Sequence, residues 1–214
     1  IGLKDFPKLI DQMLAMESSA SAKSMKEALR KACQRMGNRD AASKILLERM
    51  DDSSANAQID LMDLLDYVGG DTALTGAKQA AAGSDNAAAD AATRALGKWM
   101  TPDAAPVLME LAQSGNPAFR VRCLRGYIRI IRQFGLKPGQ RLQMTQKAFD
   151  AATRDEERKL LLDTLTRFPS PRGLKMAVSY LQTPTLTDDA VKAALTVGEK
   201  IVDNSPQAVV AVMP

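Results

Sequence analysis

The sequence contains no histidine. Histidine is the commonest general base, the commonest metal ligand and the commonest pH-sensitive charge in proteins. Its absence excludes zinc sites built on imidazole, and two distant cysteines cannot form a cysteine-only zinc site. The sequence therefore gives no reason to expect a metal ion, a cofactor or a catalytic residue.

Cysteine is almost absent too, with only Cys33 and Cys123, which lie 90 residues apart. Each lies inside a helical pattern, in the stretches ALRKACQRM and RVRCLRGYI. A disulfide requires Cα atoms within about 7 Å of each other. Helices three repeats apart in an extended stack do not approach so closely, so we expect both cysteines to be small core residues.

Aromatic residues make up only 4% of the chain, and β-branched runs bounded by turn residues are missing. Alanine and leucine are abundant instead, and they are strong helix formers. No apolar run approaches the roughly 18 residues of a membrane span, and the given sequence contains no n-region or h-region of a signal peptide. We expect an all-α fragment of a longer protein, without a membrane span.

A joint between two helices recurs about every 32 residues. It reads LDYVG then GDTALTGAKQA at 65–80, ALGKW then MTPDAAPVLMEL at 95–111, and LTRF then PSPRGLKMAVSYL at 165–181. A fixed period of this length is the mark of a solenoid of stacked helix pairs. Each pair buries its narrow apolar stripe only against the next pair.

This period predicts one domain over 1–214, built as a right-handed α–α superhelix of about six helix pairs. The pairs are expected at about 3–36, 39–68, 71–99, 102–134, 138–168 and 170–203, and residues 204–214 begin a seventh. Helix starts are expected at four N-cap side chains, Asp85, Asn116, Asp155 and Thr187, and near Pro102, Pro117, Pro138 and Pro171.

The residues at these joints resemble the HEAT-type repeat. The resemblance lies in DNAAADAATRALGKW followed by TPDAAPVLMELAQ, in NPAFRVRCLRGYIRII with Val121 and Arg122 at the familiar Val-Arg position, and in DEERKLLLDTLTRFPSPRGLKMAVSYL. It covers about residues 39–203 and implies an ARM-like solenoid. Gly97 has no matching glycine at Arg129 or Thr166, which leaves the exact repeat borders open.

The run RALGKWMTPDAAPVLMELA with RVRCLRGYIRI resembles, more narrowly, HEAT-like domains of large bacterial secreted or envelope proteins. There such domains accompany sugar-processing domains on the same polypeptide. This resemblance implies a bacterial accessory domain, located in the periplasm, in the envelope or outside the cell. It carries no catalytic motif that could be transferred to this chain.

Charge gathers in the middle of the chain, where residues 116–175 hold 14 Lys and Arg against 5 Asp and Glu, a net charge of +9. The whole chain carries only +4. Four arginines follow the spacing i, i+3, i+7, i+10 of one helix face, and we call them the arginine ridge: Arg122, Arg125, Arg129 and Arg132.

Two interpretations of the arginine ridge remain open. It could bind an anionic ligand on the concave face, since guanidinium groups suit carboxylate and phosphate, with Tyr127 adding a stacking surface. Alternatively, the ridge is satisfied by acidic side chains of neighbouring helices. The candidates are Asp155, Glu156, Glu157 and Asp163. Nucleic acid is not favoured, because basic charge does not extend across several repeats.

Other patterns point to structure. The row Asp60, Asp63 and Asp66 on one straight helix cannot supply the converging oxygens of a Ca²⁺ site, so we interpret it as a solvated face. Trp99 is expected in the core at a helix end.

Some HEAT-like folds are DNA glycosylases, but this sequence lacks the acidic residue beside aromatic side chains in a basic groove that such chemistry requires. We therefore predict a non-enzymatic scaffold that binds a protein partner or a neighbouring domain.

Overall fold

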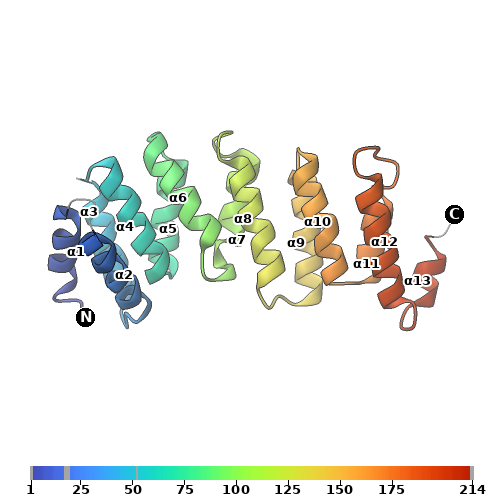
Figure 1. The fold of residues 1–214 in the computed structure, drawn as a ribbon, viewed down its shortest axis with the longest axis horizontal. Helices are drawn as coiled ribbons and strands as arrows, with labels where there is room; N and C mark the ends of the chain where they lie inside the picture. The colour runs from blue at the N-terminus through green and yellow to red at the C-terminus, as the bar shows by residue number, and fades with distance from the viewer. Residues whose placement is uncertain (1, 17–19, 52, 213–214) are drawn as a thin grey trace. The chain divides into compact units, whose positions relative to one another are not determined.

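The computed structural model describes residues 2–16, 20–51 and 53–212 (Figure 1). Throughout these residues the regular structure is helical, and no strand occurs. Helices pack against their neighbours in sequence order. The chain thus folds as an all-α helical repeat, as its period predicts.

Two compact units make up the chain, Ile1–Gly126 and Tyr127–Pro214. The division falls within one helix, α8 (Arg120–Gln133). Each unit is described by itself. A single domain over 1–214 therefore stays a prediction.

In the residues that the structure describes, the first unit contains three complete helix pairs and the beginning of a fourth. Its elements are α1 (Phe6–Ala15), α2 (Ala20–Gln34), α3 (Arg39–Asp51), α4 (Ala55–Val68), α5 (Asp71–Ala82), α6 (Asn86–Lys98), the 3-10 helix η1 (Pro102–Ala104), α7 (Ala105–Ser114) and the start of α8. Odd-numbered helices are the first helices of their pairs and even-numbered helices the second. First helices contact first helices (α3 with α5, α5 with α7), and second helices contact second helices (α2 with α4, α4 with α6).

The second unit continues the same pattern. It contains the rest of α8, α9 (Pro138–Ala151), α10 (Asp155–Arg167), α11 (Pro171–Val178), α12 (Thr187–Ile201) and α13 (Pro206–Val210). Here α10 packs on α12, and α13 packs on both α11 and α12. The short α13 lies within residues 204–214, where the sequence predicts the start of a seventh pair.

Arg141 ties three helices of the second unit together. Its Nε donates to the Ile131 carbonyl at 3.1 Å, and its Nη2 donates to the Phe134 carbonyl at 2.8 Å. The guanidinium carbon also lies 3.6 Å from the centroid of the Phe168 ring. A cation near the last carbonyls of α8 is favoured by the helix dipole. Arg141 therefore links α8, α9 and the end of α10.

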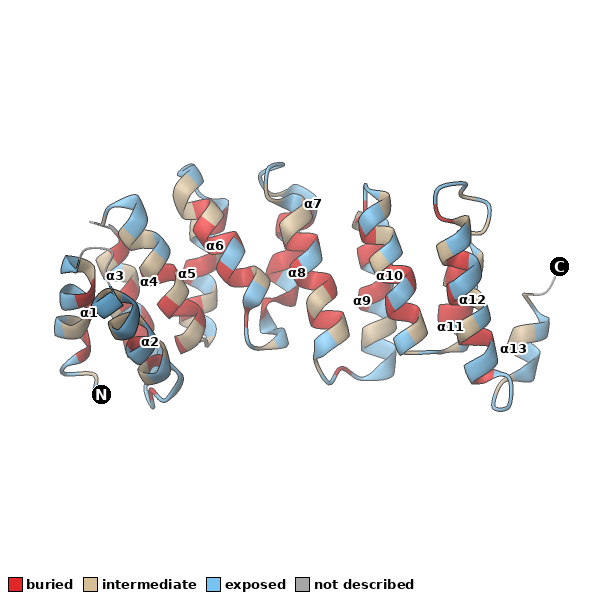
Figure 2. Cartoon of the chain, in the orientation of Figure 1, coloured by how far each residue is buried: buried red, intermediate tan, exposed pale blue. Residues whose placement is uncertain are grey.

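The core follows the apolar spacing of the helices (Figure 2). Trp99, the C-cap of α6, is 1% exposed, so its predicted place in the core is confirmed. Cys33 and Cys123 are both buried and free, as expected. Burial raises the pKa of Cys33 to about 12 and that of Cys123 to about 11, so both stay protonated at neutral pH.

The second helices α6 and α8 approach each other closely where two glycines meet. A Cβ on Gly126 of α8 would lie 2.9 Å from the Cα of Gly97 on α6, and 3.2 Å from a methyl group of Leu108. Real Cβ atoms do not tolerate a backbone contact this short. Glycine at position 126 is therefore required by packing, because α6 and α8 touch through their backbones.

Four of the eight predicted helix-start residues agree with the structure. Asp85 caps α6 by accepting from the backbone N–H groups of Ala87 and Ala88. Prolines open η1 (Pro102), α9 (Pro138) and α11 (Pro171), where a missing N–H has no cost.

Three predicted N-caps are wrong. Asn116 accepts from Ala118 N–H in a turn that includes Pro117, and α8 begins later, at Arg120. Asp155 is the first helical residue after the N-cap Arg154, and its carboxylate accepts from Arg158. Thr187 follows the N-cap Leu186 and donates its hydroxyl to the carbonyls of Leu181 and Thr183.

Candidate functional site

Polar side chains connect equivalent helices of neighbouring repeats, and we call these contacts the inter-repeat bridges. Those between second helices are Lys26 to Asp60, Arg30 to Asp63, Arg122 to Asp90, Arg132 to Asp163, Lys159 to Asp189 and Lys200 to the Thr166 carbonyl. Those between first helices are Arg49 to Asp11, Thr72 to Asp40 and Lys78 to Glu110. The partners lie 30 to 38 residues apart, close to the sequence period.

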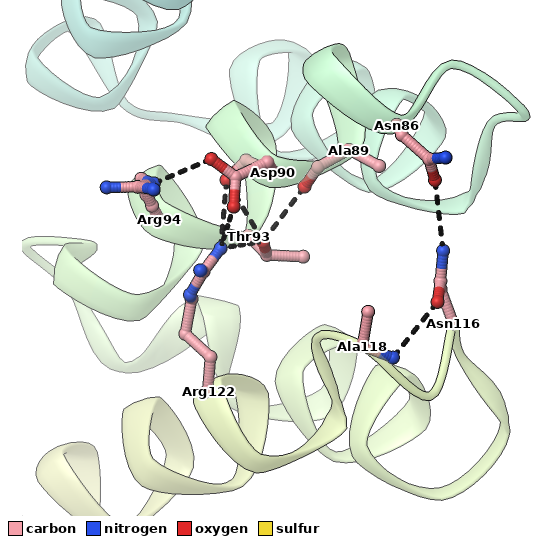
Figure 3. Close-up of polar contacts among 8 residues, drawn as sticks. All are labelled: Asn86, Ala89, Asp90, Thr93, Arg94, Asn116, Ala118 and Arg122. Atoms are coloured by element: carbon pink, nitrogen blue, oxygen red, sulfur yellow. Dashed lines mark hydrogen bonds and ion pairs between the residues drawn. The ribbon is translucent and has the colours of Figure 1, made fainter.

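Arg122 makes the most elaborate bridge (Figure 3). Its Nη1 donates to Asp90 Oδ1 at 2.7 Å, to the Asp90 carbonyl at 3.2 Å and to Thr93 Oγ1 at 2.9 Å. The Thr93 hydroxyl in turn donates a hydrogen bond to the Ala89 carbonyl at 2.8 Å. One guanidinium of α8 therefore holds both a side chain and the backbone of α6.

Asp90 is shared between two arginines. Arg94 on the same helix donates Nε to Asp90 Oδ2 at 2.8 Å, beside the Arg122 contact. Burial raises the pKa of Asp90, but the hydrogen bonds from Arg122 and Arg94 outweigh this, and the pKa lies below its ordinary value. Asp90 is therefore charged at neutral pH, and each of its carboxylate oxygens accepts from one of the two arginines.

Arg132 pairs with Asp163 Oδ2 at 2.8 Å, and Arg167 shares the same oxygen at 3.1 Å. Asp163 is one of the acidic partners that the sequence suggests for the arginine ridge. The other three, Asp155, Glu156 and Glu157, pair instead with Arg154 and Arg158 near the start of their own helix.

The remaining ridge residues differ in exposure. Arg125 is exposed. Arg129 is half-buried; it donates to Gln133 Oε1 at 3.1 Å and lies 5.6 Å from the Phe134 ring centroid. Tyr127 is only 3% exposed, and burial raises the pKa of its hydroxyl to about 12. The expectation that Tyr127 offers a stacking surface is therefore wrong, because its ring belongs to the core.

The three aspartates of α4, Asp60, Asp63 and Asp66, do not form the solvated face that the sequence predicts. Asp60 pairs with Lys26, and Asp63 pairs with Arg30 at 2.7 Å. Asp66 is buried, with 7% of its surface exposed. Within the described residues, no group of three or more His, Cys, Asp or Glu side chains could hold a metal ion.

Two hollows lie within single units. One of about 250 Å³ in the second unit is lined by Pro138, Arg141, Leu142, Thr145, Thr164, Leu165, Arg167, Phe168, Pro169 and Ser170, none of which is acidic. A groove of about 510 Å³ in the first unit includes Lys44, Glu48, Gln58 and Asp85 among its lining residues. Asp85 already caps α6, and Gln58 Nε2 already donates to the Met50 and Ser53 carbonyls.

Comparisons with known proteins add little to these observations. No protein-family model matches the chain, and no curated protein matches it significantly. Two crystal structures of engineered proteins from the Northeast Structural Genomics Consortium are similar in structure, each with a TM-score of 0.44. The first is 15% identical and covers 91% of this chain and 97% of its own.

The second engineered protein is 16% identical and covers 97% of this chain, which spans 61% of that protein's length. The described helices include none long and apolar enough to cross a bilayer.

Proposed function

We propose that the chain is a non-enzymatic protein-interaction or scaffolding module of the HEAT type, serving as an accessory domain of a larger bacterial protein. The HEAT-like joint sequences motivate the family and the bacterial source. The all-α helical repeat supports the scaffold role, since repeated helix pairs present extended surfaces rather than one enclosed catalytic cleft.

The observation that carries this proposal is the use of charged side chains between repeats. A catalytic site needs acids and bases aimed at a substrate, with pKa values matched to their task. Here Asp90, Asp163 and Asp189 are instead aimed at cations of neighbouring helices. Such contacts fix the spacing of the helices, which a scaffold requires in order to present a constant surface to its partner.

A displayed peptide library tests this proposal directly. We expect the folded chain to select peptides that bind saturably in calorimetry and that remain chemically unchanged by mass spectrometry. The urea-unfolded chain is the control and should lose this binding, because the surface belongs to stacked helices. Turnover of a peptide, glycan or nucleic acid by the chain, abolished by a point substitution, would contradict the proposal.

A second candidate is an anion-binding module that uses the arginine ridge. Its support is the exposure of Arg125 together with the net charge of +9 over residues 116–175. Polyanion binding should weaken log-linearly with salt and should fall for Arg125→Ala. Lys147→Ala, an exposed cation on α9, is the matched control, and equal loss for both variants would contradict a specific role of Arg125.

A further inference from the structure

The hollow of about 250 Å³ in the second unit combines an apolar wall with basic side chains and has no acidic residue in its lining. It lies where the start of α9, the end of α10 and the segment before α11 meet, and we call it the α9–α11 hollow. Its apolar wall is made by Pro138, Leu142, Leu165, Phe168 and Pro169. A water molecule occupies about 30 Å³, so the hollow has room for an organic molecule with one short apolar side chain or ring.

Arg141 brings hydrogen-bond donors to the α9–α11 hollow that the protein itself does not use. Its Nε and Nη2 form one edge of the guanidinium, and this edge donates to the carbonyls of Ile131 and Phe134, which are not part of the lining. Phe168 lies against the flat face of the group. Two of the five N–H groups are engaged in this way, and among the described residues Nη1 has no hydrogen-bond partner. The edge formed by Nη1 and Nη2 is therefore available to a molecule in the hollow.

Arg167 adds a second cation that is only partly neutralised. Its Nε and Nη2 both pair with Asp163 Oδ2, at 3.1 Å each. Arg132 shares the same carboxylate oxygen at 2.8 Å, so one aspartate serves two arginines. Asp163 does not line the hollow, and the charge around the hollow therefore stays positive.

The hydroxyl groups of the lining differ in what they can still offer. Thr145 and Thr164 donate their protons to carbonyls of their own helices, at 2.9 Å and 2.7 Å. Ser170 Oγ accepts from the Gly173 N–H at 3.0 Å, and its own proton has no acceptor among the described residues. Ser170 is therefore one more donor beside the two arginines.

We propose that the α9–α11 hollow binds a small organic carboxylate with an apolar body. The carboxylate accepts from the available edge of Arg141, because a guanidinium edge matches the two oxygens of a carboxylate. Arg167 and the Ser170 hydroxyl are further donors, and the apolar body packs against Leu142 and Leu165. Inorganic phosphate would leave the apolar wall uncovered, and a neutral molecule would leave the charge unmatched. The site uses no residue of the arginine ridge.

Nitrogen–proton correlation NMR of the labelled full chain tests this site, with hydrocinnamate as the probe. A ligand of this size is expected to bind with a Kd in the millimolar range. Saturable shifts should gather in the backbone amides of 138–145 and 164–170. Hydrocinnamamide has the same shape without the charge and should bind about tenfold more weakly. N-acetyl-alanylphenylalanine carries the carboxylate at the end of a peptide: shifts in the same amides would include peptide ends among the ligands, and their absence would restrict the ligands to free acids.

Substitutions separate this site from general attraction to a basic protein. Arg141→Lys keeps a cation but loses the planar edge, and should weaken hydrocinnamate binding about tenfold. Since Arg141 also links helices, Arg167→Gln at an exposed residue is the second variant and should weaken binding severalfold. Lys192→Ala removes an exposed cation of α12 outside the hollow and should leave the Kd unchanged. The proposal is overturned by equal affinity for acid and amide, by the absence of saturable shifts in these amides, or by equal losses for Arg167→Gln and Lys192→Ala.

Discussion

A methyl group added to Gly126 would collide with the backbone of α6. We predict that Gly126→Ala lowers the free energy of unfolding of the first unit by about 1–3 kcal/mol, as overpacking does elsewhere. Urea denaturation followed by Trp99 fluorescence measures this, since Trp99 is the single tryptophan and lies buried in the same unit.

Gly97→Ala is the matched control on the facing helix. A Cβ there would meet no atom within 4 Å, and alanine favours a helix over glycine by up to about 1 kcal/mol. We therefore expect Gly97→Ala to be neutral or stabilising. Equal destabilisation by both substitutions would show that the close approach of α6 and α8 is not what Gly126 provides.

Among single residues, the sequence could predict that the arginines of the ridge share one helix face, but it could predict only some of their ion-pair partners. The spacing of Arg122, Arg125, Arg129 and Arg132 on one helix follows directly from helical geometry. The pairing of Arg122 with Asp90, 32 residues away, depends on how far α8 is shifted along α6, which no local pattern encodes. Tyr127 was misjudged because a tyrosine can lie on either the core side or the polar side of such a helix.

At the scale of the helix, Asp85 tests how much a cap contributes. Its carboxylate accepts from the N–H groups of Ala87 and Ala88, which have no partner inside α6. We predict that Asp85→Ala costs about 1 kcal/mol in urea denaturation followed by Trp99 fluorescence. Asp85→Asn keeps an acceptor oxygen and should cost almost nothing. A loss as large for Asn as for Ala would point to lost charge rather than a lost cap.

Helix positions could be predicted well because glycine, proline and small polar residues mark the joints. The starts of α9 and α11 coincide with Pro138 and Pro171. The start of α8 could not be predicted, because Asn116 closes a turn with the same hydrogen bond that an N-cap would make. The predicted N-cap at Thr187 was wrong for a related reason. A threonine hydroxyl can donate to carbonyls that precede it in the chain, as here to Leu181 and Thr183, as readily as it can accept from the N–H groups of the helix that follows.

For the whole molecule, the recurring feature is the set of inter-repeat bridges. A single exposed ion pair contributes only about 0–1 kcal/mol, so no one bridge determines the fold. Their common spacing near 32 residues links the sequence period to the packing of like helices upon like helices. Within each unit, buried apolar side chains form the core, and the bridges add polar contacts between equivalent helices of neighbouring repeats.

The Asp90 bridge should also depend on pH. Its pKa lies below the ordinary value of 3.8 in the folded state, so its stabilising contribution is complete above that value. The contribution is lost as the pH falls through the lowered pKa, because the protonated carboxyl no longer attracts Arg122. We expect the energetic coupling between Asp90 and Arg122 to stay constant from neutral pH down to about 4 and to fall below that.

The central claim, that charged residues one repeat apart hold neighbouring helices, is tested most directly by a double-mutant cycle on Asp90 and Arg122. The free energy of unfolding would be measured at neutral pH by Trp99 fluorescence for the wild type, Asp90→Ala, Arg122→Ala and the double variant. We predict a favourable coupling of about 0.5–1 kcal/mol. Strictly additive losses from the two single substitutions would contradict the account.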